Sequence, residues 1–271
     1  MKLLTANTHS LVEKDYKKKL NYFVDFICKN DYDIVAMQEV NQSISAKQVL
    51  MNIKNQEIVI REDNHILNVV KGLSEKGKKY YWAWEPIKIG YDKYDEGIGI
   101  ISKYKILETK TFYITLDRDY KNWRTRKVLG IKTYIDGENI WFFSIHMGWW
   151  KDEDGFRSQF KKLETNIKEI VKPGETVYLM GDFNNPADVR NEGYDEIVKS
   201  WNDTYDLAKN KDDGITVEGL IDGWKEYKNI ENMRIDFIFV NKKENIQSSR
   251  VVCNGKQGEI VSDHYFVEIV K

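Results

Sequence analysis

Residues 176–185 read TVYLMGDFNN, an apolar run followed directly by polar side chains. The run from Thr176 to Met180 is rich in branched and aromatic residues and predicts a buried β-strand. It ends at Gly181-Asp182, and Asn184 follows two residues later. Such a strand presents a carboxylate and an amide at the edge of a sheet, although the letters DFNNP also favour a tight turn.

Working outward from this stretch, five other apolar runs end on, or contain, a residue of the metal-binding or acid–base type. Two strand ends of this kind would be ordinary, whereas six that all carry Asp, Glu, Asn or His indicate a site. Because strand ends along one edge of a sandwich can converge, we expect these side chains to lie together. The five additions are Asn7 at the end of residues 2–7, Glu39 near the end of 33–40, His146 at the end of 139–146, Asp236 within 234–240, and Asp263-His264 before the last strand.

The remaining pattern predicts an α/β fold with mainly antiparallel sheet. Apolar residues recur at helical spacing in residues 15–29, 63–78 and 155–171. Two sheets packed face to face and flanked by helices would accommodate this order. With only three prolines and no linker-like segment, we expect a single domain over residues 1–271. Strands are expected at 2–7, 33–40, 80–90, 96–102, 111–116, 127–136, 139–146, 176–180, 234–240, 248–253 and 264–270.

The charge balance argues against a nonspecific nucleic-acid binder. Lys and Arg number 42 and Asp and Glu number 43, so the net charge is −1 and no basic footprint is visible. Cys28 and Cys253 show no paired spacing and are expected to be small buried hydrophobes. Since no leader-like or membrane-length apolar segment is seen, we expect a cytoplasmic protein with no membrane contact and no obligate protein partner.

Together these pieces resemble the endonuclease/exonuclease/phosphatase family, which includes DNase I-like nucleases, sphingomyelinases and inositol polyphosphate 5-phosphatases. The resemblance implies a four-layer α/β/β/α sandwich of two mainly antiparallel mixed sheets, and hydrolysis of a phosphoester that depends on Mg²⁺ or Mn²⁺. Gly181-Asp182-Phe183-Asn184 and Ser262-Asp263-His264 are its most specific parts. The other matches, in the family's order, are Thr5-Ala6-Asn7-Thr8, Gln38-Glu39-Val40, Ser144-Ile145-His146 and Arg234-Ile235-Asp236-Phe237-Ile238.

The resemblance also implies a role for each residue near the metal and the attacking water. Glu39, supported by Asn7 and Asp263, would ligate the cation through oxygen. Asp182 would be the general base for the attacking water, and Asn184 would hold a phosphate oxygen. The alternative for Glu39 is an exposed carboxylate at a strand end.

The histidines are assigned in the same way. Asp236 would orient His264, which would contact the phosphate, because a buried carboxylate needs a partner. The alternative is a structural ion pair between Asp236 and Arg234. His146 would lie near the leaving oxygen, unless it is structural, and His9 is a candidate for the edge of the site. His65 has no supporting context.

Substrate choice must come from loops, and those at 91–96, 146–154 and 216–224 mix aromatic with acidic residues. Such loops suit sugar rings and hydroxyls better than a DNA backbone. The stretch SIHMGWWKD at 144–152 and IDGW at 221–224 resemble the bacterial maltose 6′-phosphate phosphatases, a branch that acts on a small phosphorylated sugar. The candidate substrate-binding residues are Trp149, Trp150, Trp224 and Arg126.

Several alternatives stay open. The tryptophans could instead pack on the core, and either Arg124 or Arg126 could bind phosphate, or both could belong to a charged edge strand. A magnesium-dependent DNA nuclease or abasic-site endonuclease requires a local basic groove, and a sphingomyelinase-type phospholipase C an exposed apolar hairpin. A binding module without catalysis is disfavoured by the intact set of metal and acid–base candidates.

Overall fold

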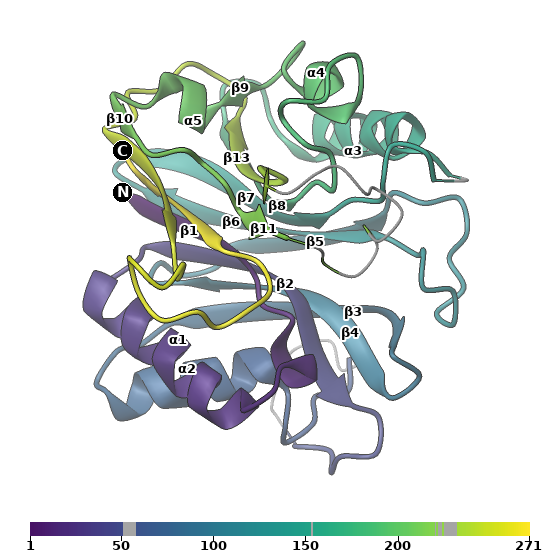
Figure 1. Ribbon diagram of the computed structural model, residues 1–271, viewed down its shortest axis with the longest axis vertical. Helices are drawn as coiled ribbons and strands as arrows, with labels where there is room; N and C mark the ends of the chain where they lie inside the picture. Colours follow the sequence, from purple (N-terminus) through teal and green to yellow (C-terminus); the bar gives the residue numbers. More distant parts are fainter. Residues whose placement is uncertain (51–57, 153, 220, 222–223, 225–231) are drawn as a thin grey trace.

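The protein folds into two β-sheets packed face to face, with helices on both outer faces (Figure 1). The computed structural model describes residues 1–50, 58–152, 154–219, 221, 224 and 232–271. One sheet has seven strands, in the order β10 (Asn210–Lys211), β14 (Ser248–Val252), β15 (Phe266–Val270), β1 (Lys2–Asn7), β2 (Ile34–Ser43), β4 (Tyr94–Ser102) and β3 (Tyr81–Gly90).

The second sheet has six strands, and a short ribbon pairs β11 (Val217–Glu218) with β12 (Asn232–Met233). The pairs β1–β2, β10–β14 and β7–β8 are parallel, and the other named pairs are antiparallel. The six strands are, in order, β5 (Glu108–Tyr113), β6 (Lys127–Ile135), β7 (Glu138–His146), β8 (Thr176–Asp182), β13 (Asp236–Val240) and β9 (Asn202–Asp203).

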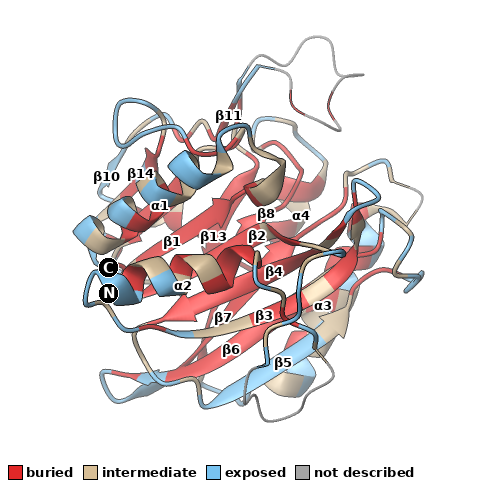
Figure 2. Ribbon diagram, turned by 90° about the horizontal axis from the view of Figure 1, so that it is seen from below, coloured by how far each residue is buried: buried red, intermediate tan, exposed pale blue. Residues whose placement is uncertain are grey.

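Apolar cores fill all three spaces between the four layers. Helices α1 (Tyr16–Asn30) and α2 (His65–Glu75) bury Val24 and Leu73 against the seven-stranded sheet. Ile100 and Phe142 meet between the sheets, and α3 (Phe156–Ile170) covers the six-stranded sheet. Figure 2 shows the buried strands between helices whose outward faces are exposed. The predicted four-layer α/β/β/α sandwich is therefore confirmed.

The expected and observed elements differ mainly at their ends. The strand expected at 111–116 is β5, at Glu108–Tyr113, because its first residues are exposed and polar on an edge strand and give no apolar signal. The strand expected to end near Val40 continues to Ser43 through a register shift. The shortest elements carry too little periodicity to predict. They include 3₁₀ helix η1 (Ser10–Val12), α4 (Gly193–Ile197), α5 (Thr204–Leu207) and the two-residue strands.

The helices in the described part of the chain are too short or too polar to cross a membrane.

Candidate active site

Three neighbouring strands of the six-stranded sheet bring His146, Asp182 and Asp236 side by side. His146 pairs with Asp182 across the parallel β7–β8 ladder, and Asp236 pairs with the same Asp182 across the antiparallel β8–β13 ladder. Asp182 is the last residue of β8, and Asp236 is the first residue of β13. The ladders therefore place all three residues side by side where neighbouring strands end or begin, as the pattern of strand ends predicts.

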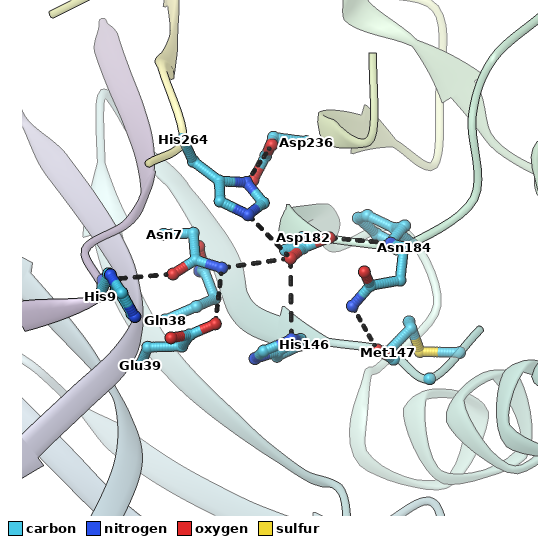
Figure 3. A network of polar contacts seen from close by, with 12 residues as sticks. Asn7, His9, Gln38, Glu39, His146, Met147, Asp182, Asn184, Asp236 and His264 are labelled. Carbon is cyan, nitrogen blue, oxygen red and sulfur yellow. Dashed lines mark hydrogen bonds and ion pairs between the residues drawn. The ribbon is translucent and has the colours of Figure 1, made fainter. Parts of the chain in front are cut away.

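The seven-stranded sheet contributes Asn7 and Glu39 from the opposite side. The β2 register shifts between Met37 and Val40, and Glu39 has a left-handed φ of 52°. A bulge of this kind re-aims a side chain. Asn7 Nδ2 donates to Glu39 Oε1 at 3.0 Å and to Asp182 Oδ2 at 3.1 Å, so it joins the two halves of the site (Figure 3).

Buried polar contacts hold the two sheets together directly beneath these residues. Gln38 Nε2 donates to Ser144 Oγ at 3.0 Å, and Ser144 Oγ donates to the Met37 carbonyl at 3.0 Å. Gln38 and Ser144 are fully buried, where unmade hydrogen bonds are costly. Gln38 directly precedes Glu39, and Ser144 lies two residues before His146. Their role as a link between the sheets was not predicted.

The Gly181–Asn184 segment combines a close strand contact with a tight turn. A Cβ at Gly181 would lie 1.9 Å from the Ile145 carbonyl oxygen, so only glycine allows β7 and β8 to approach in this way. The Asn184 N–H donates to Asp182 Oδ1 at 2.8 Å, and Asn184 has φ of 50°. The turn that the sequence offered as an alternative is present, and it orients the Asp182 carboxylate.

Asp236 and His264 form a buried pair. His264 Nδ1 lies 2.9 Å from Asp236 Oδ2, and both side chains are almost completely buried. Burial lowers the pKa of His264, but the charge and hydrogen bond of Asp236 outweigh it and raise that pKa to about 10. The alternative pair with Arg234 is wrong, because Arg234 Nη1 instead lies 2.6 Å from Asp203 Oδ2.

The pKa of the Asp182 carboxyl is raised and the pKa of the His146 imidazole is lowered, so both groups are shifted toward their neutral forms. Burial and the charge of Asp236 raise the pKa of Asp182 to about 7, although His264 and the Asn184 N–H oppose the shift. Burial and the Arg126 charge hold the pKa of His146 well below its usual range. The Nε2 atoms of His146 and His264 lie 3.6 and 3.9 Å from Asp182 Oδ2. One carboxylate thus faces a neutral and a cationic imidazole.

His146, Asp182 and Asp236 form a row, and the oxygen donors next to this row fit a hard divalent cation. Burial and the charge of Glu96 raise the pKa of Glu39, and Asp263 adds to the repulsion. A divalent cation would relieve that repulsion, and Mg²⁺ and Mn²⁺ favour carboxylate and amide oxygens. Glu39, Asp263 and the Asn7 carbonyl oxygen are the candidate ligands. His9 lies at their edge, with Nδ1 3.6 Å from Asp263 Oδ1 and 2.7 Å from Glu13 Oε1.

A cavity of about 360 Å³ opens above the row and extends toward β3, β4 and the start of β6. Lys88 and Glu96 also line it, as a buried ion pair with 3.2 Å between Nζ and Oε1. Lys88 was not among the predicted residues. Pro86 marks the register shift in β3 just before it, which is the one sequence signal for an irregular, inward-facing position.

The loop tryptophans do not all reach this cavity. Trp149 lines it, edge to face with Trp123 at a centroid distance of 5.9 Å. Trp150 packs against Phe156, and together with Trp224 it lines a neighbouring hollow of about 210 Å³. Trp224 Nε1 donates to Asn184 Oδ1 at 3.3 Å. Asn184 Nδ2 donates to the Met147 carbonyl at 3.0 Å.

The other candidates are resolved by their positions. Arg126 is buried and lines the cavity, whereas Arg124 is largely exposed and lies 3.7 Å from Asp152. His65 is the buried first residue of α2 and does not line the cavity. Cys28 and Cys253 are free thiols. Of the IDGW motif, Asp222 and Gly223 lie outside the described residues.

The family model described as endonuclease/exonuclease/phosphatase family matches residues 4–264. A solved structure of a protein of that family from Leptotrichia buccalis is 32% identical, with a TM-score of 0.88 over 100% of this chain and 98% of that one. No curated protein matches the sequence. The agreement therefore covers both the sequence motifs and the whole fold.

More distant solved structures share the fold. A mannosyl-6-phosphatase from Bacteroides thetaiotaomicron is 18% identical, with a TM-score of 0.71 over 100% of this chain and 98% of that chain. Truncated TDP2 from Caenorhabditis elegans is 15% identical, with a TM-score of 0.63 over 99% and 95%. At these identities the likeness concerns the fold alone.

Proposed function

The chain belongs to the endonuclease/exonuclease/phosphatase family of hydrolases, and from this membership we propose that it is a metal-dependent phosphatase that acts on a small phosphorylated sugar such as maltose 6′-phosphate. One observation carries the proposal: the row around Asp182 opens into a cavity that Trp123 and Trp149 also line. Ligand sites with a few placed polar groups and aromatic walls are typical of small-molecule substrates.

The reaction is hydrolysis by in-line attack of water on phosphorus. The water oxygen bonds to phosphorus, the bond between phosphorus and the sugar oxygen breaks, and that oxygen takes up a proton from solvent. The sugar leaves as an alcohol and inorganic phosphate remains. Asp182 orients the water and accepts its proton, because a pKa of about 7 suits a base near neutral pH. Glu39, Asn7 and Asp263 would hold a Mg²⁺ or Mn²⁺ ion, which would supply charge neutralisation at the phosphate.

The two imidazoles have different tasks in this reaction. His264, kept cationic by Asp236, stabilises negative charge on the phosphate oxygens. His146, kept neutral by burial and by Arg126, lies beside the leaving oxygen. Asn184 positions the turn that holds Asp182, and Trp224 in turn contacts Asn184.

The other residues that line the cavity suit a sugar as the rest of the substrate. Trp149 offers an aromatic face, and sugar rings stack on such faces. The Lys88–Glu96 pair offers donors and acceptors that match neighbouring hydroxyl groups. A mannosyl-6-phosphatase shares this fold, so the fold accommodates a substrate of this class. The net charge of −1 argues against a DNA backbone as substrate.

Phosphate release tests the proposal directly. The purified chain with Mg²⁺, Mn²⁺ or EDTA is offered disaccharide phosphates, monosaccharide phosphates, nucleotides, plasmid DNA and abasic-site oligonucleotides. We expect metal-dependent release from sugar phosphates. Strong DNA cleavage without turnover of any sugar phosphate would favour a nuclease instead.

The sugar wall has its own test. Trp149→Ala should raise KM for a sugar phosphate more than KM for p-nitrophenyl phosphate, because the aryl ester lacks the sugar that the indole contacts. Trp150→Ala should have a smaller effect, since Trp150 packs on Phe156 beside the neighbouring hollow. Equal effects of Trp149→Ala on both substrates would contradict the wall.

A further inference from the structure

Arg126 is a buried cation that has no counter-ion among the residues that the structure describes. Its residue is 3% exposed, and its Nε is buried without a hydrogen bond. Within the described ranges, no carboxylate forms an ion pair with its guanidinium. Because arginine stays protonated in proteins, burial of an unpaired guanidinium costs free energy that a bound anion would recover.

Glu96, which lines the same cavity, and the acidic partners of the neighbouring Arg124 and Lys127 are each engaged with another cation. Glu96 pairs with Lys88 at 3.2 Å, Glu85 pairs with Lys127, and Asp152 lies 3.7 Å from Arg124. Rearrangement of any of these pairs to serve Arg126 would leave a second cation unpaired. The missing anion is therefore expected to come from a ligand.

The position of Arg126 connects that anion to the reacting phosphate. Arg126 lines the same cavity as His146 and Asp182, and its charge is the strongest cationic influence on His146. The Trp149 ring lies 5.6 Å from the guanidinium carbon and covers it. An anion next to His146 would thus meet the guanidinium in a site shielded from water, where charge-assisted hydrogen bonds are strongest.

We propose that Arg126 makes the site select a phosphate monoester over a phosphodiester. A monoester has three non-bridging oxygens that share two negative charges, whereas a diester has two that share one. The additional oxygen can accept paired hydrogen bonds from the planar guanidinium, and in a diester that corner carries a carbon substituent. This selectivity rests on the proposed phosphatase function and separates it from the diester chemistry of nucleases.

The test compares p-nitrophenyl phosphate with bis(p-nitrophenyl) phosphate in the metal-loaded full chain. Arg126→Gln should lower kcat/KM for the monoester about 10- to 100-fold, the range of a hydrogen bond to a charged group. The same variant should change kcat/KM for the diester by less than about threefold. Arg126→Lys should restore part of the monoester preference, because it keeps the charge and loses the paired geometry.

Three further measurements exclude a merely structural effect. The exposed Arg118, in the same loop before β6, provides a matched variant, and Arg118→Gln should leave the monoester-to-diester ratio unchanged. Arg126→Gln should retain or raise the ligand-free melting temperature, since it removes an unpaired buried charge. Inhibition by inorganic phosphate should weaken in Arg126→Gln by a factor similar to the monoester loss.

The outcomes separate the two proposals. If Arg126→Gln lowers monoester and diester hydrolysis equally, or leaves both unchanged, the selectivity inference is overturned while the phosphatase proposal stands. If the wild-type chain releases no phosphate from any monoester, the proposed function fails and the inference fails with it.

Discussion

Asp182 is held from several sides at once, and this explains how one carboxylate can serve as the base. The Asn184 N–H holds Oδ1 at 2.8 Å, and Asn7 Nδ2 holds Oδ2 at 3.1 Å. Neither contact removes the carboxylate from the cavity that it lines. Orientation and a raised pKa are therefore both consequences of where β8 ends.

The Asp182→Asn variant should lose turnover without losing the fold. The amide keeps the size and most hydrogen-bonding positions of the carboxylate but cannot accept a proton, so kcat should fall about 10²- to 10⁴-fold. Phosphate release and thermal unfolding, measured on the same preparation, check this expectation. Near-normal hydrolysis by a folded Asp182→Asn protein would rule out Asp182 as the base.

Asp236→Asn should shift the alkaline limb of the pH profile. In the wild type, Asp236 overcomes the effect of burial and raises the pKa of His264 to about 10. Without that charge, burial lowers the pKa, so the imidazolium is lost at a lower pH as pH rises. The kcat/KM profile should therefore decline on the alkaline side at lower pH than in the wild type. An NMR titration of His264 gives an independent readout, and an unchanged pKa would contradict the assignment.

His65 belongs to the fold and not to the site, and it should make stability depend on pH. Burial lowers the pKa of His65 from 6.5 to about 3. Between these values the unfolded chain binds a proton that the native protein does not, so stability falls as pH falls, by about 1.4 kcal/mol per unit. Urea unfolding from pH 4.5 to 7 should show a shallower slope for His65→Gln than for the wild type. Identical slopes would show that His65 does not contribute.

At the scale of elements, the sequence predicts the residues of the row better than it predicts their directions. Asp182 was correctly placed at the end of a strand, because it directly follows an apolar run, whereas Asp236 was expected within a strand over 234–240 and instead begins β13. Glu39 was expected near a strand end, yet β2 continues to Ser43 and Glu39 turns inward at a bulge. A bulge and a strand end give the same sequence pattern, because both place a polar residue after an apolar run.

The burial of Lys88, Glu96 and Arg126 at the cavity was the least predictable feature of the site. Lys88 and Glu96 lie on neighbouring strands of one sheet, and Arg126 precedes a strand of the other. Their burial depends on how the two sheets pack, which no local period records. The same reason explains why Trp149 lines both hollows, whereas Trp150, although adjacent in sequence, lines only the smaller one.

Gly181→Ala should separate β7 from β8 and disturb the row that these strands carry. A Cβ there would lie 1.9 Å from the Ile145 carbonyl oxygen, which is backbone and cannot rotate away. We expect a loss of about 2–4 kcal/mol in the free energy of unfolding, together with loss of turnover.

Gly137→Ala is the matched control for this variant. Gly137 also has a positive φ, of 88°, but a Cβ there would meet no atom within 4 Å. It should therefore cost only the backbone strain, about 1 kcal/mol. Equal losses for the two variants in denaturant unfolding would show that the strand contact is not what requires Gly181.

At the scale of the whole molecule, the site exists only where the two sheets meet. The six-stranded sheet supplies His146, Asp182 and Asp236, and the seven-stranded sheet supplies Asn7 and Glu39. The Gln38–Ser144 contact beneath them fixes the separation of the sheets. A ligand that bridges both halves must therefore stabilise the packing of the entire sandwich, which links metal binding to global unfolding.

Metal binding should raise the melting temperature of the wild-type chain, and Glu39→Gln should abolish that increase. A cation at one hundred times its Kd stabilises the native state by about 2.7 kcal/mol, and EDTA should reverse the effect. Without metal, Glu39→Gln should be as stable as the wild type or more stable, because the half-buried Glu39 carboxylate is repelled by Glu96 and Asp263. Loss of the metal response with retained basal stability separates a missing ligand from a misfolded protein. The exposed Glu169 on α3 offers the control, and Glu169→Gln should keep the full response. An equal metal-dependent increase in Glu39→Gln and the wild type would place the cation elsewhere.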